Sequence, residues 1–409
     1  MKYMGRIRGE ATKPAVYIFL LVLASILMSQ SAPPQRVGPL PDGSFLLNSG
    51  WRLKPAGLQI PLDTLPMSCT MSRHGRFLFV LNGGYKPPSI SVIELSENKV
   101  VSTVQAPKDA WLGLALAPDG KTLWVGGGSS ASIHEFKYDG TGTLTLARTF
   151  PLVKPEQATP QDFIGDVAVS PDGRLLYAAD IFHDSIVVVN AQSGAVIGHF
   201  KTGRRPYRIL FHPDGKSFFV TSWADGTLHH HQASDGSSLQ TIRVGAHPTD
   251  ILWRDGAVGE ETGIAARLFV PAANTNNVYS IGVSESKDLK PLETINIATT
   301  PRHPLGMTPS ALAMSADAKT LYIVCSDANA VAVADITEER THVTGFIPAG
   351  WYPTAAAALS DGRLIVLNGK GLRSFANPHG PQPMTTPEVP HKGGREGYVG
   401  YLQTGTASV

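Results

Sequence analysis

The stretch from Arg204 to Arg208 holds three arginines, Arg204, Arg205 and Arg208, together with Tyr207. A guanidinium group presents its N–H donors in a planar fork that matches a carboxylate or a phosphate. A small anionic ligand bound here is therefore one hypothesis. The alternative is that carboxylates elsewhere in the chain pair with these arginines and tie parts of the fold together.

Asp166, His247 and Asp250 are the ionisable groups that would decide between those hypotheses. In the structural alternative, Asp166 and Asp250 are the carboxylates that pair with the arginines. In a functional alternative, the same three groups form the acid/base set that a hydrolase such as a lactonase needs near its substrate.

Several aromatic residues fall in loops of the expected fold, namely Trp111, Trp223, Trp351 and Tyr352. Tryptophan and tyrosine are enriched where proteins bind partners, so these four residues could form a partner-binding patch. They could equally be packed beneath neighbouring loops. The sequence leaves both possibilities open.

Histidines suggest a metal site only weakly. In the run from His229 to His231, alternate residues of a strand face opposite sides, so only His229 and His231 share a face. Two ligands are too few for a zinc site, and His183 with Asp184 adds only a further pair elsewhere. We expect no metal and no cofactor, and we expect the histidine run to lie on an outer strand or in solvent.

The elements that would position these residues are short strands. Residues 162–203 contain four apolar runs rich in Val, Ile and Leu, separated by Pro-Asp-Gly, Phe-His-Asp and Gln-Ser-Gly breaks. Such runs are strand signals, and four antiparallel strands in about 40 residues is the size of one propeller blade.

This unit recurs along the chain. Most copies centre on a turn in which Asp bonds its own backbone and Gly takes the positive-φ position, and the first copy has Ser-Arg-His-Gly instead. The seven turn positions are Gly75, Gly120, Gly173, Gly215, Gly256, Ala318 and Gly362. Ala318 departs from the pattern, which leaves its turn type open. The repeat predicts an all-β fold, a seven-bladed β-propeller of four-stranded antiparallel blades.

Closure of the ring requires a strand that the seventh unit lacks. One candidate is residues 53–62 and the other is residues 398–409, of which we favour the N-terminal segment. The expected organisation is therefore residues 1–32 as a signal peptide or anchor, 33–63 as an extension with the closing strand, 64–375 as the propeller, 376–396 as a Pro/Gly-rich loop and 397–409 as a C-terminal strand segment.

The expected topology gathers the charged and aromatic residues on one face. Loops between blades share that face with the loops between the second and third strands of each blade, whereas the Asp-Gly turns occupy the other. Binding residues tend to lie on loops held by a rigid scaffold. We therefore place the ligand site on the loop-rich face, at the mouth of the central channel.

Composition and the N-terminus set the cellular context. Charged residues are 17% of the chain and the net charge is +2, which gives no electrostatic case for nucleic acid. Basic residues precede an apolar run at 15–28 and small residues follow it, as in an export signal. We expect a periplasmic or extracellular protein, bound to a membrane only if this segment stays uncleaved. Cys69 and Cys325 would lie in different, non-adjacent blades, so we expect two free, buried thiols.

With the repeat in view, the chain resembles YncE-like, YVTN-type seven-bladed propellers, on the stretches 170–177 and 320–324. Residues 81–90, 204–209, 272–277 and 349–354 resemble the propeller of bacterial proteins that carry a C-terminal alkaline-phosphatase-type phosphoesterase. The resemblance implies the fold and, as a possible partner, a phosphoesterase domain. No phosphoesterase segment or catalytic residue is recognisable in this sequence.

The function that we expect from the sequence is a non-catalytic binding or scaffolding module. Its partner would be an unidentified protein or a small anionic ligand at the propeller mouth. The alternatives are the propeller half of a phosphoesterase and a lactonase-like hydrolase. The candidate binding residues are Asp166, His183, Arg204, Arg205, Tyr207, Arg208, His247, Asp250, Trp111, Trp223, Trp351 and Tyr352.

Overall fold

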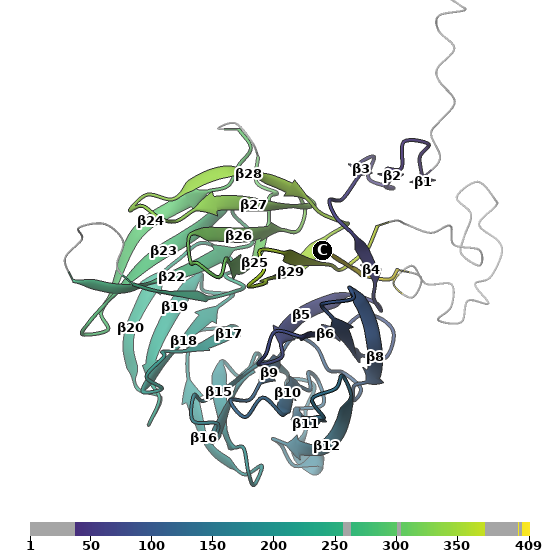
Figure 1. Ribbon diagram of the computed structural model, residues 1–409. Helices are drawn as coiled ribbons and strands as arrows, with labels where there is room; N and C mark the ends of the chain where they lie inside the picture. The colour runs from purple at the N-terminus through teal and green to yellow at the C-terminus, as the bar shows by residue number, and fades with distance from the viewer. Residues whose placement is uncertain (1–36, 257–262, 301–303, 373–399, 401–402) are drawn as a thin grey trace, which may run out of the picture.

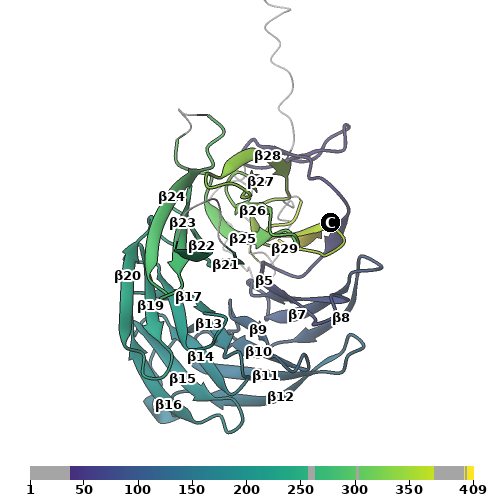
Figure 2. The same cartoon turned by 60° about the vertical axis from the view of Figure 1, so that its left-hand side comes forward.

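A computed structural model describes residues 37–256, 263–300, 304–372, 400 and 403–409. It contains seven four-stranded antiparallel sheets and one small three-stranded sheet. Figures 1 and 2 show the seven sheets arranged as blades around a common centre, with β5, β9 and β25 near the centre and β8, β12 and β28 at the rim. The predicted seven-bladed propeller is confirmed.

The blades follow one another along the chain, each running from an inner to an outer strand. Blades 1 to 3 comprise β5 (Pro66–Met71), β6 (Phe77–Asn82), β7 (Ser89–Glu94) and β8 (Lys99–Gln105); β9 (Leu114–Leu116), β10 (Thr122–Gly126), β11 (Ser132–Tyr138) and β12 (Leu144–Pro151); and β13 (Ile164–Val169), β14 (Leu175–Asp180), β15 (Ser185–Asn190) and β16 (Val196–Lys201). Blades 4 to 6 comprise β17 (Pro206–Phe211), β18 (Ser217–Ser222), β19 (Thr227–Gln232) and β20 (Ser238–Arg243); β21 (Leu252–Asp255), β22 (Ile264–Ala272), β23 (Asn277–Ser284) and β24 (Leu289–Asn296); and β25 (Pro309–Met314), β26 (Thr320–Cys325), β27 (Ala330–Asp335) and β28 (His342–Pro348).

Blade 7 is assembled from both ends of the described chain. Its order is β29 (Pro353–Ala358), β30 (Leu364–Asn368), β31 (Thr406–Ser408) and β4 (Gln59–Pro61). Residues 53–62 and 398–409 were the two candidates for the closing strand, and the sheet contains a strand from each. β31 is the third strand and β4 the outermost, so the two ends pair directly with each other.

Burial explains why the repeats read as continuous apolar runs. Both faces of each blade are covered by its neighbours, so β6 and β7 are buried at every position. The rim strands have one solvent-facing side, and β8 accordingly alternates between exposed and partly buried residues.

Each junction between neighbouring blades holds its own apolar cluster. Phe79 and Leu123 meet between blades 1 and 2, and Tyr177 and Phe218 meet between blades 3 and 4. At the seam, Ile60 from the N-terminal segment packs with residues of blades 7 and 1. Since no blade can bury its two faces alone, these clusters hold the ring together.

The Asp-Gly turns have the structural role expected of them. In the turn that follows β13, the N–H of Gly173 donates to the Ser170 carbonyl over 2.8 Å, and Gly173 adopts φ 74°. The carboxylate of Asp172 accepts the Ser170 hydroxyl and the Arg174 N–H. Ala318 adopts the same left-handed conformation with φ 55°, which answers the question of its turn type.

A small sheet lies outside the ring. It consists of β1 (Gly38–Pro39), β2 (Phe45–Leu46) and β3 (Arg52–Leu53), and Figure 1 shows it beside the seam. The expected signal peptide and the Pro/Gly-rich loop at 376–396 lie outside the described residues. Within the described part of the chain, no helix is long and apolar enough to cross a membrane.

Candidate functional site

The inner strands begin with a recurring device that the Asp-Gly pattern did not reveal. Five of them follow a residue with positive φ that stands directly before a proline, in the pairs Leu65-Pro66, Arg205-Pro206, His247-Pro248, Thr308-Pro309 and Tyr352-Pro353. Non-glycine residues seldom adopt this conformation. In four of these five strands, β5, β17, β25 and β29, the proline is the first residue of the strand, and the residue that follows it lines the channel. X-Pro pairs that recur at about the repeat spacing are the sequence signal that could have located these channel-lining residues.

A charged clamp crosses the middle of the channel. Arg208 on β17 bonds Asp166 through Nη1 at 3.2 Å and Asp250 through Nε at 3.1 Å. Asp166 also accepts the N–H of Ile209, and Asp250 accepts the N–H of Leu312, each over 2.9 Å. The clamp therefore links blades 3, 4, 5 and 6, and the predicted pairing with Asp166 and Asp250 holds for Arg208 but not for Arg204, which pairs with Asp225.

The clamp is held at the cost of burying charge. Burial opposes the charge on Arg208, but the two carboxylates outweigh burial and raise its pKa above the usual value. Burial raises the pKa of Asp166 despite the attraction of Arg208. The oxygens of Asp250 accept bonds from Arg208, Leu312 and its neighbour Ile251. With its lone pairs engaged in this way, Asp250 is poorly placed to act as a base.

The clamp borders a cavity of about 390 Å³, which Arg208 and Asp250 help to line. Its lining includes several residues that the sequence analysis singled out and several that it did not. They are Tyr207, Arg208, Trp223, His247, Asp250 and Tyr352, joined by Met67, Cys69, Thr249, Asn274, Ser310 and Asp327. A volume of this size is typical of small-molecule sites.

One wall of the cavity is an aromatic pair. Trp223 stacks on the His247 ring with centroids 3.6 Å apart and planes 4° apart, and 36% of the Trp223 surface stays exposed. Tyr207 also lines the cavity, and burial raises the pKa of its phenol to about 12. Tyr207 therefore stays protonated at neutral pH and can donate a hydrogen bond.

Other predicted site residues lie outside this cavity. Arg204 pairs with Asp225 at 2.7 Å, and the Arg205 guanidinium lies 4.3 Å from the centre of the Phe182 ring. Trp111 packs edge-on against Phe163 and Tyr207.

Trp351 and Tyr352 both lie beneath Lys370. Of these two, only Tyr352 lines the cavity. Of the four predicted aromatic residues, Trp223 and Tyr352 line the cavity and Trp111 and Trp351 do not.

Two expectations from the sequence are corrected. The histidine run is neither solvated nor on an outer strand, because it forms the third strand of blade 4, where His230 and His231 are buried beside Phe219 and Phe218. Cys69 and Cys325 are free, but Cys69 is only partly buried and lines the cavity. Burial raises the pKa of the Cys69 thiol to about 12, which makes it a poor nucleophile.

His183 has partners that the sequence analysis did not foresee. Its Nδ1 lies 2.9 Å from Asp180 and 3.7 Å from Asp162. Asp184, which the sequence suggested as its partner, instead accepts the N–H of Arg205 over 2.9 Å.

Comparison with known proteins supports the propeller fold. The model of the family "Lactonase, 7-bladed beta-propeller" matches residues 113–245. A WD repeat-containing protein, VIP3, from Arabidopsis thaliana is 28% identical over 127 residues, which is 30% of this chain. The matched part spans about 38% of the length of that curated relative.

Solved structures share the fold at low sequence identity. The periplasmic gluconolactonase of Pseudomonas aeruginosa superposes with a TM-score of 0.53 at 18% identity, covering 73% of this chain and 88% of the other. Hydrazine synthase of Kuenenia stuttgartiensis superposes with a TM-score of 0.59 at 17% identity, covering 75% and 93%. One fold thus serves unrelated chemistries, so function must be argued from the site.

Proposed function

We propose that the cavity on the loop-rich face binds a small, neutral, sugar-derived molecule, and that the protein acts as a binding module. The observation that carries this proposal is the exposed Trp223 ring stacked on His247 in a cavity that also presents polar groups. An aromatic face packs against the C–H face of a sugar ring, and hydroxyl, amide and carboxylate groups around it bond the sugar hydroxyls.

The charges around the cavity support a neutral ligand over an anionic one. Arg208 already pairs with two carboxylates, so the clamp carries a formal net charge of −1. Asp327 adds a further carboxylate to the lining. The negative charge of the site would repel an anion, whereas it would not repel a neutral lactone or sugar.

Titration calorimetry with glucono-1,5-lactone and with gluconate tests this proposal. We expect saturable binding of the lactone that weakens roughly tenfold in Trp223→Ala, because the stacking surface is lost. Trp351→Ala is the matched control, since Trp351 lies outside the cavity, and it should bind as wild type does. Equal weakening in both variants, or tighter binding of gluconate, would count against the proposal.

Lactone hydrolysis is the second candidate, and the family model that matches residues 113–245 favours it. His247 is the candidate general base for water, and Tyr207 is the candidate donor to the oxyanion that forms on the carbonyl oxygen. Lactone turnover above the spontaneous rate, lost in His247→Ala and reduced in Tyr207→Phe, would support hydrolysis. Binding of the lactone without turnover would contradict hydrolysis and support the binding-module proposal.

We also propose that the protein acts outside the cytoplasm. The N-terminal basic–apolar–small pattern supports export, and a periplasmic gluconolactonase shares the fold. Fractionation of expressing cells tests this, and recovery from the cytosol alone would contradict it.

The phosphoesterase partnership is a separate proposal, supported by the local resemblance at 81–90, 204–209, 272–277 and 349–354. An in-frame phosphoesterase sequence after codon 409 would support it. A stop codon there would count against it.

A further inference from the structure

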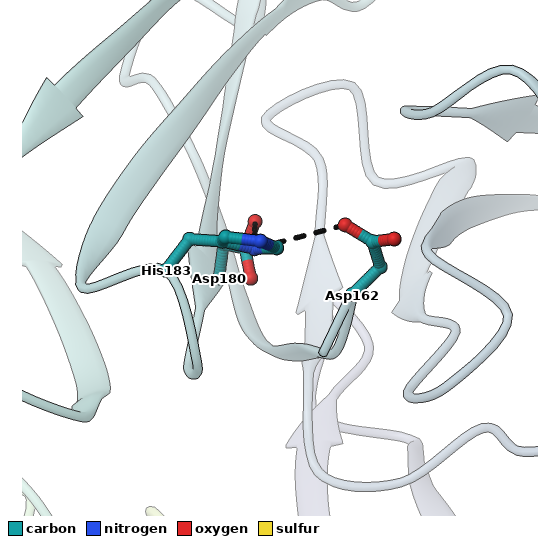
Figure 3. A group of neighbouring side chains, drawn as sticks. All are labelled: Asp162, Asp180 and His183. Atoms are coloured by element: carbon teal, nitrogen blue, oxygen red, sulfur yellow. Dashed lines mark hydrogen bonds and ion pairs between the residues drawn. The ribbon is translucent and has the colours of Figure 1, made fainter. Parts of the chain in front are cut away.

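We infer that Asp162, Asp180 and His183 form a binding site for one divalent transition-metal ion on the loop-rich face of blade 3. The residues come from three neighbouring positions in the fold. Asp162 precedes β13, Asp180 ends β14, and His183 lies in the turn to β15. Figure 3 shows the Asp162 carboxylate facing the His183 imidazole, with Asp180 overlapping the imidazole in this view. None of the three lines the cavity described above.

The spacing of the donor atoms fits a single ion. His183 Nδ1 lies 2.9 Å from Asp180 Oδ2 and 3.7 Å from Asp162 Oδ1, and one ligand atom from each residue lies within 4.8 Å of the others. Zinc holds nitrogen and oxygen ligands at about 2.0–2.2 Å, which puts tetrahedral ligand atoms about 3.4 Å apart. The observed distances fall on both sides of that value, so small side-chain adjustments suffice.

A second observation indicates that a ligand is missing from this group. Asp180 is only 6% exposed, and its buried Oδ1 makes no hydrogen bond of normal geometry to a described residue, although the backbone N–H of Phe163 lies close enough to the carboxylate to help lower its pKa. A buried carboxylate oxygen without a partner is costly, and native proteins satisfy nearly all such groups. A cation between Asp180 and its neighbours would provide the missing partner.

Charge balance leads to the same conclusion. Asp162 is also 6% exposed, and Thr159 donates to its Oδ2, which leaves Oδ1 facing His183. One imidazolium could neutralise only one of two buried carboxylates. A divalent ion with neutral His183 neutralises both.

The donor set selects the class of ion. Imidazole nitrogen suits zinc, copper, iron and nickel, and carboxylates suit magnesium, calcium and manganese, so a mixed set favours Zn²⁺ or Mn²⁺ over the alkaline-earth ions. Three protein ligands leave a fourth position open, as in catalytic rather than structural zinc sites. His183 is about two-fifths exposed, which gives that position access to solvent.

The experiment is a titration of tag-free, EDTA-stripped full-length protein with Zn²⁺ and, separately, Mn²⁺. We expect one ion per chain, with affinity weakened roughly tenfold or more in His183→Ala and in Asp162→Asn. Asp184→Asn is the matched control, because it changes a neighbouring carboxylate that bonds the Arg205 N–H instead. That variant should bind Zn²⁺ as wild type does.

A crystal soaked with zinc gives a readout that does not depend on any variant. An anomalous zinc peak between Asp162, Asp180 and His183 is the expected result. The inference is overturned by a peak only elsewhere, by no binding of either ion up to about 1 mM, or by unchanged affinity in both ligand variants.

Discussion

The propeller has a turn face, which carries the Asp-Gly turns, and a loop face, which is the loop-rich one. The pKa values of their aspartates are shifted in opposite directions. On the turn face, Asp172 and Asp317 each accept a serine hydroxyl and a backbone N–H of their own turn, and these bonds lower their pKa values. On the loop face, Asp166 and Asp180 are buried, and burial raises their pKa values. The first pair is stabilised as carboxylates by the nearest few residues. The second pair depends on groups from distant parts of the chain or on a ligand.

This difference separates repeated structure from possible function. The turn-face bonds recur from blade to blade, and turn chemistry explains them fully. The loop-face side chains are not repeated in this way, because the position of Arg208 holds Asp166 in blade 3, Asp250 in blade 5, Ala311 in blade 6 and Ala355 in blade 7. A polar residue that breaks the repeat is therefore the better candidate for function than one that obeys it.

The largest effect should follow from opening the clamp. Arg208→Ala leaves Asp166 and Asp250 without their cation in a buried site, and we expect the free energy of unfolding to fall by about 3–5 kcal/mol. Urea denaturation measures this loss. The triple variant with Arg208→Met, Asp166→Asn and Asp250→Asn should recover most of it, because no charge is then left unpaired. A loss below about 1 kcal/mol in Arg208→Ala would mean that the clamp is not structural.

On the turn face, backbone conformation should dominate. Ala318 stands at φ 55° where its equivalents are glycine, so Ala318→Gly should stabilise the protein by about 0.5–1 kcal/mol. The reverse change, Gly173→Ala, should cost about 1–2 kcal/mol from strain alone, since an added Cβ would come no closer than 3.6 Å to its neighbours. Thermal unfolding of both variants checks the pair, and a destabilised Ala318→Gly would contradict the assignment.

A smaller effect concerns the pH dependence of stability, which should have opposite signs for an aspartate on the turn face and one on the loop face. Asp172 has a lowered folded pKa, so its charge stabilises the fold above the unfolded pKa near 3.8 and this contribution disappears as the pH falls. Asp180 has a raised pKa, so its contribution is present below 3.8 and is lost as the pH rises through the folded value.

Asp172→Asn should therefore lose stability at neutral pH, and Asp180→Asn in EDTA should gain it, each by less than about 1 kcal/mol. Both differences should shrink towards pH 3. Denaturation between about pH 3 and pH 7 measures how the stability change of each variant depends on pH. If both variants changed stability in the same direction, the two faces would not differ in how they hold aspartate.

The smallest effect should come from an exposed charge on the loop face. Arg204 pairs with Asp225, but 68% of the Arg204 side chain is exposed. We expect Arg204→Ala to leave the urea midpoint unchanged within the error of the same assay, because solvent screens an exposed ion pair. A loss comparable to that of Arg208→Ala would mean that solvent exposure does not determine how much these ion pairs contribute to stability.

Much of the fold could be predicted from the sequence because its signals are local. The turn at Gly173 and the buried run of β14 are each written in a few consecutive residues, and their recurrence gives the blade number. Blade 7 was harder, because a three-residue strand such as β31 carries almost no pattern. Only its partners β30 and β4 identify it.

The candidate site was predictable only in part, because contacts across blades are not visible in a linear sequence. The pairing of Arg208 with two carboxylates was one of two open alternatives, and the repeat spacing brought the three residues near one another. The group of Asp162, Asp180 and His183 escaped notice because Asp180 reads as the end of an apolar strand and Asp162 as part of a loop. No motif spacing joins them.

The seam in blade 7 has a consequence for how the molecule folds. Ser408 donates a hydrogen bond to Gln59, its partner in the same sheet, across 349 positions of sequence. Blades 1 to 6 can each form from neighbouring residues, but the final sheet requires the two most distant segments of the ring to meet. Contacts of such long range form slowly. We expect closure to be the late, rate-limiting event of folding, with an open, six-bladed intermediate whose first and last blades expose unpaired apolar faces until then.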